Sequence, residues 1–284
     1  MTTLQNKIDF AIIFRVKNAN PNGDPLNGNR PRTDYGGLGE ITDVCLKRKL
    51  RDRLQEAGEA IFVQSDDRRK DEHGSLANRA KAVLGIKLGG PETAKLACET
   101  WFDVRAFGQL FAIKAAKKSA KKDEVTDDAS GDTGISIGIR GPVTLQSAFS
   151  IEPVSITSTQ ITKSVSGEGD GSKRGSDTMG MKHRVDQGIY VSYGSINPQL
   201  AERTGFSAAD AEVIKTWLPK LFENDASSAR PDGSMEVVKV IWWQHDSKSG
   251  KCSSAKVHGS LTVAADGAIT LAGIGVTPEI IEGF

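Results

Sequence analysis

A mostly apolar run that passes abruptly into a polar segment is the feature that most constrains the fold of this chain. Residues 8–14 read IDFAIIF, which is typical of a buried strand. Residues 15–34 then read RVKNANPNGDPLNGNRPRTD. Asn, Pro and Gly favour turns, so this segment is either an ordinary loop or a polar shelf that holds something charged. We call residues 17–34 the polar shelf.

The composition allows a folded core and leaves the partners open. With 284 residues, of which 38% are hydrophobic and 26% charged, the chain suits one large domain or two small ones. It has 37 Lys and Arg against 36 Asp and Glu. This balance excludes a protein that is basic throughout, but it is compatible with a local basic patch.

The sequence carries no signal for export or membrane insertion. Residues 1–10, MTTLQNKIDF, lack the basic start and apolar core of a signal peptide. No apolar run approaches the ~18 residues that span a bilayer. The three cysteines, at 45, 98 and 252, are odd in number and far apart. We therefore expect no disulfide framework and a reducing, cytoplasmic location.

The order of predicted elements indicates an α+β fold. A strand is expected over residues 8–16, and a helix from the N-cap Thr42 to the stop at Gly58. Further strands are expected within 135–156, 235–246, 256–263 and 268–271, and a second helix from Ser207. This order predicts a sheet with helices on one face, as in ferredoxin-like and RNA-recognition folds.

A second long polar stretch, residues 163–184, lies between two strand-like segments. TSTQIT precedes it and GIYVSYGSI follows it, so the simplest geometry is a long hairpin. We expect its tip to carry four side chains suited to contact with a ligand: Lys173, Arg174, Met179 and Met181.

Most familiar catalytic and metal patterns are missing. The four histidines, at 73, 183, 245 and 258, match no zinc spacing. GEGDGS at 167–172 lacks a following helix, and DDASGDTG at 127–134 fails the calcium-loop pattern. We therefore expect no metal and no cofactor. Asp24 and Asp34 in the polar shelf fit metal-assisted RNA hydrolysis, or simply a capped turn and an ion pair with an arginine.

The basic residues around the shelf are more informative. Arg30 and Arg32 are joined by a glycine-rich turn to a helix that carries Lys47, Arg48 and Arg51. Exposed backbone N–H groups at such a turn bind phosphate, and nearby cations add charge. The shelf asparagines Asn18, Asn20 and Asn22 suit ribose, phosphate or base edges. The same residues also suit a plain solvated surface, and the usual aromatic RNA-recognition motif is missing.

Five ordered motifs carry a resemblance to a known family. They are KNANPNGDPLNGNRPRTD with GEITDVCLKRKLRD, FDVRAFGQLFA, IRGPVTLQSAFSIEPVSI, MGMKHRVDQGIYVSYGSINPQLAERTGFSAAD and IWWQHDSKSG. Together they resemble the CRISPR-associated backbone subunit of type I Cascade complexes, of type I-C in particular. The resemblance runs from about residue 7 to residue 263, and it is looser across 59–98 and 114–133.

This resemblance implies a single domain shaped like a hand. The palm is a modified RNA-recognition (ferredoxin-like) sheet, expected over residues 1–58, 99–162 and 185–284. The fingers are a helical insertion, expected over 59–98. The thumb is a long β-hairpin, expected over 163–184.

The resemblance also implies a non-catalytic role in antiviral defence. Copies of such a subunit stack into a helical filament along one CRISPR guide RNA (crRNA) and leave stretches exposed to pair with target DNA. The other implied partners are the large subunit, the guide-processing subunit and, indirectly, a recruited nuclease. The expected RNA-binding residues are Asn18, Asn20, Asn22, Arg30, Arg32, Lys47, Arg48, Arg51, Lys163, Lys173, Arg174, Met179, Met181, Lys182, His183 and Arg184.

Two enzymatic alternatives stay open at this point. Relatives in type III complexes cut target RNA with an aspartate from a loop after the first strand, and Asp24 or Asp34 suits that role. A guide-processing endonuclease needs a general acid–base set, for which the sequence offers only His183 in a polar loop.

Overall fold

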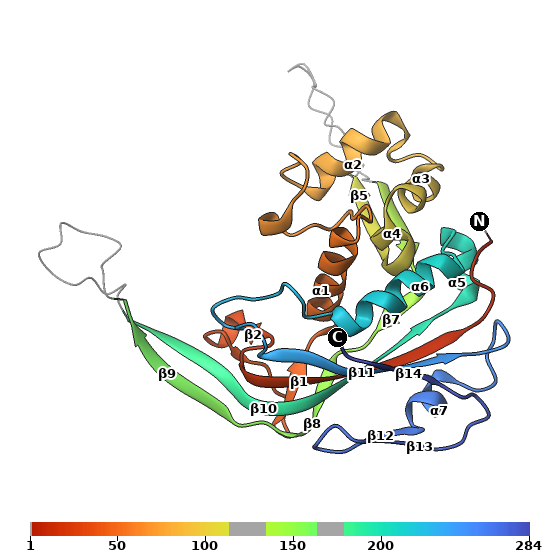
Figure 1. Ribbon diagram of the computed structural model, residues 1–284. Helices are drawn as coiled ribbons and strands as arrows, with labels where there is room; N and C mark the ends of the chain where they lie inside the picture. Colours follow the sequence, from red (N-terminus) through yellow and green to blue (C-terminus); the bar gives the residue numbers. More distant parts are fainter. Residues whose placement is uncertain (1, 114–134, 164–178) are drawn as a thin grey trace, which may run out of the picture.

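The computed structural model describes residues 2–113, 135–163 and 179–284 (Figure 1). It is a mixed α+β structure built on a large antiparallel sheet. Eight strands form this sheet in the order β14-β11-β1-β10-β8-β4, with β7 and β9 also paired to β10. No helix in the described ranges has the length and apolar character of a membrane-spanning segment.

The elements have the following bounds. The strands are β1 (Ile8–Ala19), β2 (Gly23–Asp24), β3 (Arg30–Pro31), β4 (Leu38–Ile41), β5 (Gly108–Ile113), β6 (Ile135–Arg140), β7 (Val143–Leu145), β8 (Ala148–Pro153), β9 (Ile156–Thr162), β10 (Met179–Ile196), β11 (Met235–Gln244), β12 (Leu261–Val263), β13 (Ile269–Leu271) and β14 (Glu279–Glu282). The α-helices are α1 (Asp43–Glu56), α2 (Leu76–Leu84), α3 (Thr93–Thr100), α4 (Phe102–Phe107), α5 (Pro198–Thr204), α6 (Ala208–Trp217) and α7 (Ser254–His258). Short 3-10 turns are η1 (Pro25–Asn27), η2 (Asp66–Arg68), η3 (Gly85–Lys87) and η5 (Leu218–Lys220).

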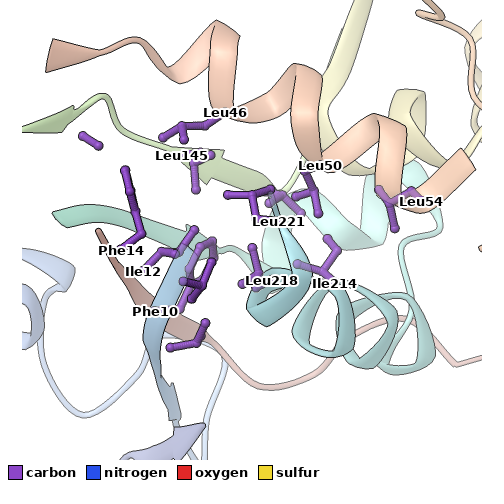
Figure 2. Close-up of a cluster of buried hydrophobic side chains, with 14 of the residues drawn as sticks. Phe10, Ile12, Phe14, Leu46, Leu50, Leu54, Leu145, Ile214, Leu218 and Leu221 are labelled. Carbon is purple, nitrogen blue, oxygen red and sulfur yellow. The ribbon is translucent and has the colours of Figure 1, made fainter. Parts of the chain in front are cut away.

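Strand β1 is the central strand and confirms the buried strand predicted from residues 8–16. It pairs with β10 on one side and β11 on the other. Phe10, Ile12 and Phe14 point to the side of the sheet that helices α1 and α6 cover (Figure 2). Ala11 and Ile13 point to the opposite side. Both faces of β1 are therefore buried, which explains why its sequence is apolar without alternation.

The second face corrects the prediction of helices on one side only. Ala11 and Ile13 lie in an apolar cluster with Val257 of α7 and Leu261 of β12, so a C-terminal layer covers this face. The strand predicted at 256–263 is wrong in its first half, because Ser253 caps α7 there by accepting a hydrogen bond from the Lys256 N–H.

Local signals placed helices α1 and α6 correctly. Thr42 is the N-cap of α1, and Leu46, Leu50 and Leu54, spaced four residues apart, are buried against the sheet (Figure 2). Ser207 and Asp210 form a capping box at the start of α6, each side chain accepting a hydrogen bond from the other residue's backbone N–H.

A separate apolar cluster holds the region around α2, α3 and the β5–β6 ribbon. Phe62, Trp101 and Phe111 form its aromatic centre, with ring centroids 4.6 and 5.2 Å from Phe62. The cluster continues past residue 98 into β5. Residues 101–113 divide between two cores, since Trp101 and Phe111 lie in this cluster and Phe102 packs in the main cluster.

Strand β10 runs from the middle of the sheet into a projecting hairpin (Figure 1). Its C-terminal part pairs with β1, whereas its first residues, 179–185, pair with β9. The hairpin therefore starts at Ile156, earlier than the stretch 163–184 suggested. Met179 to Arg184, expected in or near a polar tip, lie in a paired strand.

A change of phase separates the hairpin from the sheet. Val16 and Ala19 both lie in the helix-side cluster, although an uninterrupted strand would place residues three apart on opposite faces. Asn18 lies between them with φ +53°, a left-handed conformation that asparagine tolerates. On β10, Val185 and Tyr190 are five residues apart, which would also place them on opposite faces of an uninterrupted strand, yet both lie in the helix-side cluster. The two strands thus change phase together where the hairpin leaves the sheet.

Candidate nucleic-acid interface

The polar shelf is a small ribbon, β2–β3, closed by the turn η1 and joined to the start of α1. Asp24 accepts a hydrogen bond from the Leu26 N–H at 3.2 Å and an ion pair from Arg32 at 3.3 Å. Asp34 accepts from the Leu38 N–H at 2.8 Å. Both aspartates thus hold turns of the shelf. Within the described residues, no group of three or more His, Cys, Asp or Glu is placed to hold a metal ion.

The three shelf asparagines that were predicted to bind RNA differ in exposure. Asn20 is buried, and its side-chain amide donates to the Asn29 carbonyl at 2.7 Å. Asn22 accepts from both the N–H and the hydroxyl of Thr42 at 3.0 Å, which ties the shelf to the N-cap of α1. Asn18 is exposed at the phase change. Asn20 and Asn22 therefore build the shelf, whereas Asn18 is open to a ligand.

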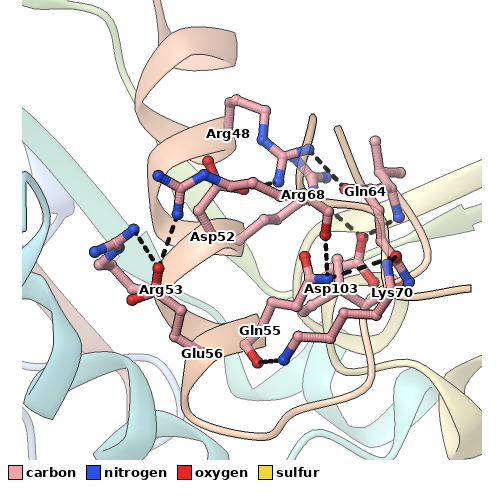
Figure 3. A network of polar contacts seen from close by, with 12 residues as sticks. Arg48, Asp52, Arg53, Gln55, Glu56, Gln64, Arg68, Lys70 and Asp103 are labelled. Carbon is pink, nitrogen blue, oxygen red and sulfur yellow. Dashed lines mark hydrogen bonds and ion pairs between the residues drawn. The ribbon is translucent and has the colours of Figure 1, made fainter. Parts of the chain in front are cut away.

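The cations of α1 turn out to have protein partners. Lys47 pairs with Asp43 at 3.0 Å. Arg48 pairs with Asp52 and donates to the Val63 carbonyl (Figure 3). The sequence did not predict these partners.

Arg51 is the most enclosed of the three α1 cations that were predicted to bind RNA. Its side chain is 13% exposed, pairs with Asp103 at 3.0 Å and lies over the Phe107 ring. Burial lowers the pKa of Arg51, and the Asp103 carboxylate opposes this shift. Asp103 also accepts from the N–H groups of Phe62 and Val63 at 2.7 and 3.0 Å. Arg51 thus fastens α1 to the α2–α3 region.

The hairpin has two different faces. Met179, Met181 and His183 are spaced two residues apart and share the face of the strand on which Val185 is buried. Met179 and Met181 are 67% and 55% exposed. Lys182 and Arg184 are on the other face. One face is therefore apolar toward its end, and the other is cationic.

The cations of the hairpin are more open than those of α1. Lys182 is exposed and has no ion pair with any residue that the structure describes. Arg184 approaches Asp186 at 3.7 Å. Lys163 is exposed at the end of β9. Lys173 and Arg174, also predicted to bind, lie outside the described residues.

The structure brings the shelf and the hairpin together through three side chains. Arg30 of β3 donates to the Ser158 hydroxyl at 3.0 Å, and that hydroxyl lies 2.8 Å from Nδ1 of His183. Arg30 and His183 were both predicted to bind RNA from distant parts of the sequence. Ser158 was not predicted, because an isolated serine in a strand carries no distinguishing signal.

A groove of about 570 Å³ opens on the opposite side of the sheet, where the C-terminal layer ends. Arg15, Lys17 and Asn18 line it from β1. Arg15 pairs with Glu236, whereas Lys17 has no ion pair within the described ranges. Sequence reasoning missed Lys17, although strand alternation from Ala11 and Ile13 places it on this face.

The chain matches a family model for "CRISPR-associated protein Cas7" over residues 6–273. A protein of Haloferax volcanii described as "CRISPR-associated protein Cas7" is 33% identical over 238 residues, covering 80% of this chain and 67% of the relative. The chain therefore belongs to the CRISPR-associated Cas7 family. This result confirms the predicted resemblance to a CRISPR-associated backbone subunit at the level of the family.

Two solved structures are also similar to this chain. A chain of a "CRISPR RNA-guided surveillance complex, pre-nicking" has a TM-score of 0.45 and 14% identity, covering 84% of this chain and 78% of its own. A chain of a "CRISPR RNA-guided surveillance complex" has a TM-score of 0.42 and 15% identity, covering 84% and 68%. The family assignment rests on the sequence matches and not on these similarities.

Proposed function

We propose that this protein is the crRNA-binding backbone subunit of a type I Cascade surveillance complex, of the I-C kind. In this proposal the main sheet is a modified RNA-recognition palm, the α2–α3 region forms the fingers and the β9–β10 hairpin is the thumb. Family membership supports the general role. The observation that carries the RNA-binding role is the hairpin, which presents exposed cations on one face and exposed methionines on the other.

The two hairpin faces suit two different contacts with a guide RNA. Lys182 and Arg184 supply charge for backbone phosphates, which give affinity without reading sequence. Met179 and Met181 are unbranched and polarisable, so they suit insertion between stacked bases. Recognition of backbone and shape leaves the bases between insertions free to pair with target DNA.

Several copies of the subunit assemble along one guide in this proposal. A head-to-tail contact between copies does not close on itself and therefore builds a filament. The large subunit and the guide-processing subunit complete the complex, and a separate recruited nuclease cuts the DNA. The subunit itself cuts no RNA, in keeping with the turn-holding contacts of Asp24 and Asp34.

Light scattering after size-exclusion chromatography, with and without an RNA that contains a CRISPR repeat, tests this function. We expect a long particle with many protein copies per RNA. The paired substitution Met179→Ala with Met181→Ala should impair the assembly. The matched pair Val83→Ala with Ile86→Ala, two exposed apolar residues remote from the hairpin, should leave guide loading intact. A protein that stays monomeric and does not bind the RNA would contradict the proposal.

Incubation with labelled RNA and magnesium tests the non-catalytic part separately. We expect no specific cleavage by the wild-type protein. Cleavage that disappears in Asp24→Ala or Asp34→Ala would replace the scaffold with a type III-like RNA-cutting subunit.

A further inference from the structure

Three side chains meet where the shelf touches the base of the hairpin. Ser158 lies between Arg30, 3.0 Å from its hydroxyl, and His183, whose Nδ1 is 2.8 Å away. Arginine can only donate hydrogen bonds, so the Ser158 oxygen accepts from Arg30. The single hydroxyl hydrogen is then free to point to Nδ1 of a neutral His183, which leaves Nε2–H without a described acceptor.

The charge at this point is not neutralised within the described chain. Asp24 is the cross-strand neighbour of Arg30, but its carboxylate is taken by Arg32 and the Leu26 N–H. Strand β9, ITSTQIT, has no ionisable side chain. On β10, Lys182 and Arg184 lie on the opposite face, where Arg184 has Asp186 as partner. Arg30 is therefore the charged group that faces His183.

We propose that Arg30, Ser158 and His183 form one site for a single backbone phosphate, and that filling the site draws a proton onto His183. This inference rests on the proposed RNA-binding function and deepens it. A phosphodiester supplies a negative charge and acceptor oxygens. The three side chains supply a guanidinium, a hydroxyl and an imidazole that already converge on one point.

Protonation changes the site in two ways at once. A protonated His183 donates its Nδ1–H to Ser158, whose oxygen then accepts from both neighbours. The serine hydrogen is released and turns outward to the phosphate. The imidazolium adds a second positive charge beside Arg30, which is unfavourable in the empty site and favourable once an anion is present. Proton binding and phosphate binding therefore strengthen each other by the same factor.

Binding of a labelled repeat-containing RNA to the full chain at about pH 6 and about pH 8 tests the site, since histidine changes charge in this range. We expect the wild-type protein to bind about two- to five-fold more tightly at the lower pH, the size of an exposed charge pair. His183→Gln should abolish this gain, because glutamine keeps a hydrogen-bonding group but cannot become charged. His73→Gln is the matched control and should keep it.

Two further arms test whether phosphate is the group that the site binds. Single-stranded DNA of the same length carries the same phosphates and should show the same gain at low pH. Ser158→Ala should reduce the gain, because the hydroxyl can no longer be passed to the ligand. Far-UV circular dichroism of each variant should match the wild type, since all three residues lie at the surface.

Each result has a defined meaning. A pH gain that persists in His183→Gln, or that appears with RNA but not with DNA, would overturn the phosphate site while leaving RNA binding intact. Failure of the wild-type protein to bind RNA at either pH would instead contradict the proposed function.

Discussion

Helix α1 and the β9–β10 hairpin carry similar side chains and use them in opposite ways. On α1, Arg48 and Arg51 are turned into the protein, where they pair with Asp52 and Asp103, and Arg48 also donates to a backbone carbonyl. On the hairpin, Lys182 stands in solvent without an ion pair to any described residue. Both segments read as equally basic in sequence. The difference teaches that a basic segment is a candidate recognition surface only after the partners of its cations are known.

The sharpest test of the comparison is Asp103→Ala, at the enclosed end. Asp103 is 1% exposed and holds Arg51 together with two backbone N–H groups. Removing it leaves an enclosed cation, a buried N–H donor and a part-buried N–H donor without partners, so we expect the free energy of unfolding to fall by about 3–5 kcal/mol. Urea denaturation measures this loss. Asp186→Ala on the hairpin serves as the control and should cost less than about 1 kcal/mol. Equal losses of unfolding free energy in the two variants would show that the ion pairs of α1 and of the hairpin do not differ in this way.

A smaller, pH-dependent effect is expected where Asp71 pairs with Arg79 near α2. The Arg79 guanidinium lowers the pKa of Asp71 from its ordinary 3.8 to about 2. A lowered carboxyl pKa stabilises the fold above about pH 4, and this stabilisation is lost as the pH falls through about 2. Asp71→Asn should therefore cost about 1–2 kcal/mol near neutral pH, discounted for partial exposure.

Urea midpoints of the two proteins, measured from neutral pH down to about pH 3, check this expectation. The difference between wild type and Asp71→Asn should begin to shrink below about pH 4. A difference that stays constant with pH would mean that Asp71 contributes through neutral packing and not through its charge.

The smallest effect on stability is expected at the open end. Lys182→Ala should change the free energy of unfolding by no more than about 0.5 kcal/mol, as is usual for surface sites. If Lys182 touches a phosphate, the slope of log affinity against log salt should fall by about one. The same salt series on Arg51→Ala should leave the slope unchanged while stability falls. A lower slope for Arg51→Ala together with an unchanged slope for Lys182→Ala would instead place the RNA-binding surface on α1.

The parts of the fold that sequence predicted are those set by neighbouring residues. Thr42 and Ser207 cap their helices through residues three positions away, and the apolar run of β1 needs no partner to be recognised. The partners of Arg51 were missed because Asp103 lies 52 residues further along the chain. The left-handed Asn18 was missed because asparagine only permits this conformation and does not require it.

The candidate site shows the same division. Its polar and cationic residues were identifiable as a set, because their types suit phosphate and ribose. The sequence could not predict how these residues are grouped in space. Their grouping depends on the register between β9 and β10, which pairs Ser158 with His183. That pairing brings Arg30 into contact with the hairpin, although 128 residues separate it from Ser158.

The single strand β10, which serves both the sheet and the hairpin, limits how the hairpin's length can change during evolution. An insertion of one residue in the β10 arm exchanges the two faces of that arm, so that the methionines take the place of the lysine. Insertions of two residues in each arm preserve both faces and add about 7 Å of reach. Lineages with longer or shorter hairpins should therefore differ by even numbers of residues per arm, in discrete steps.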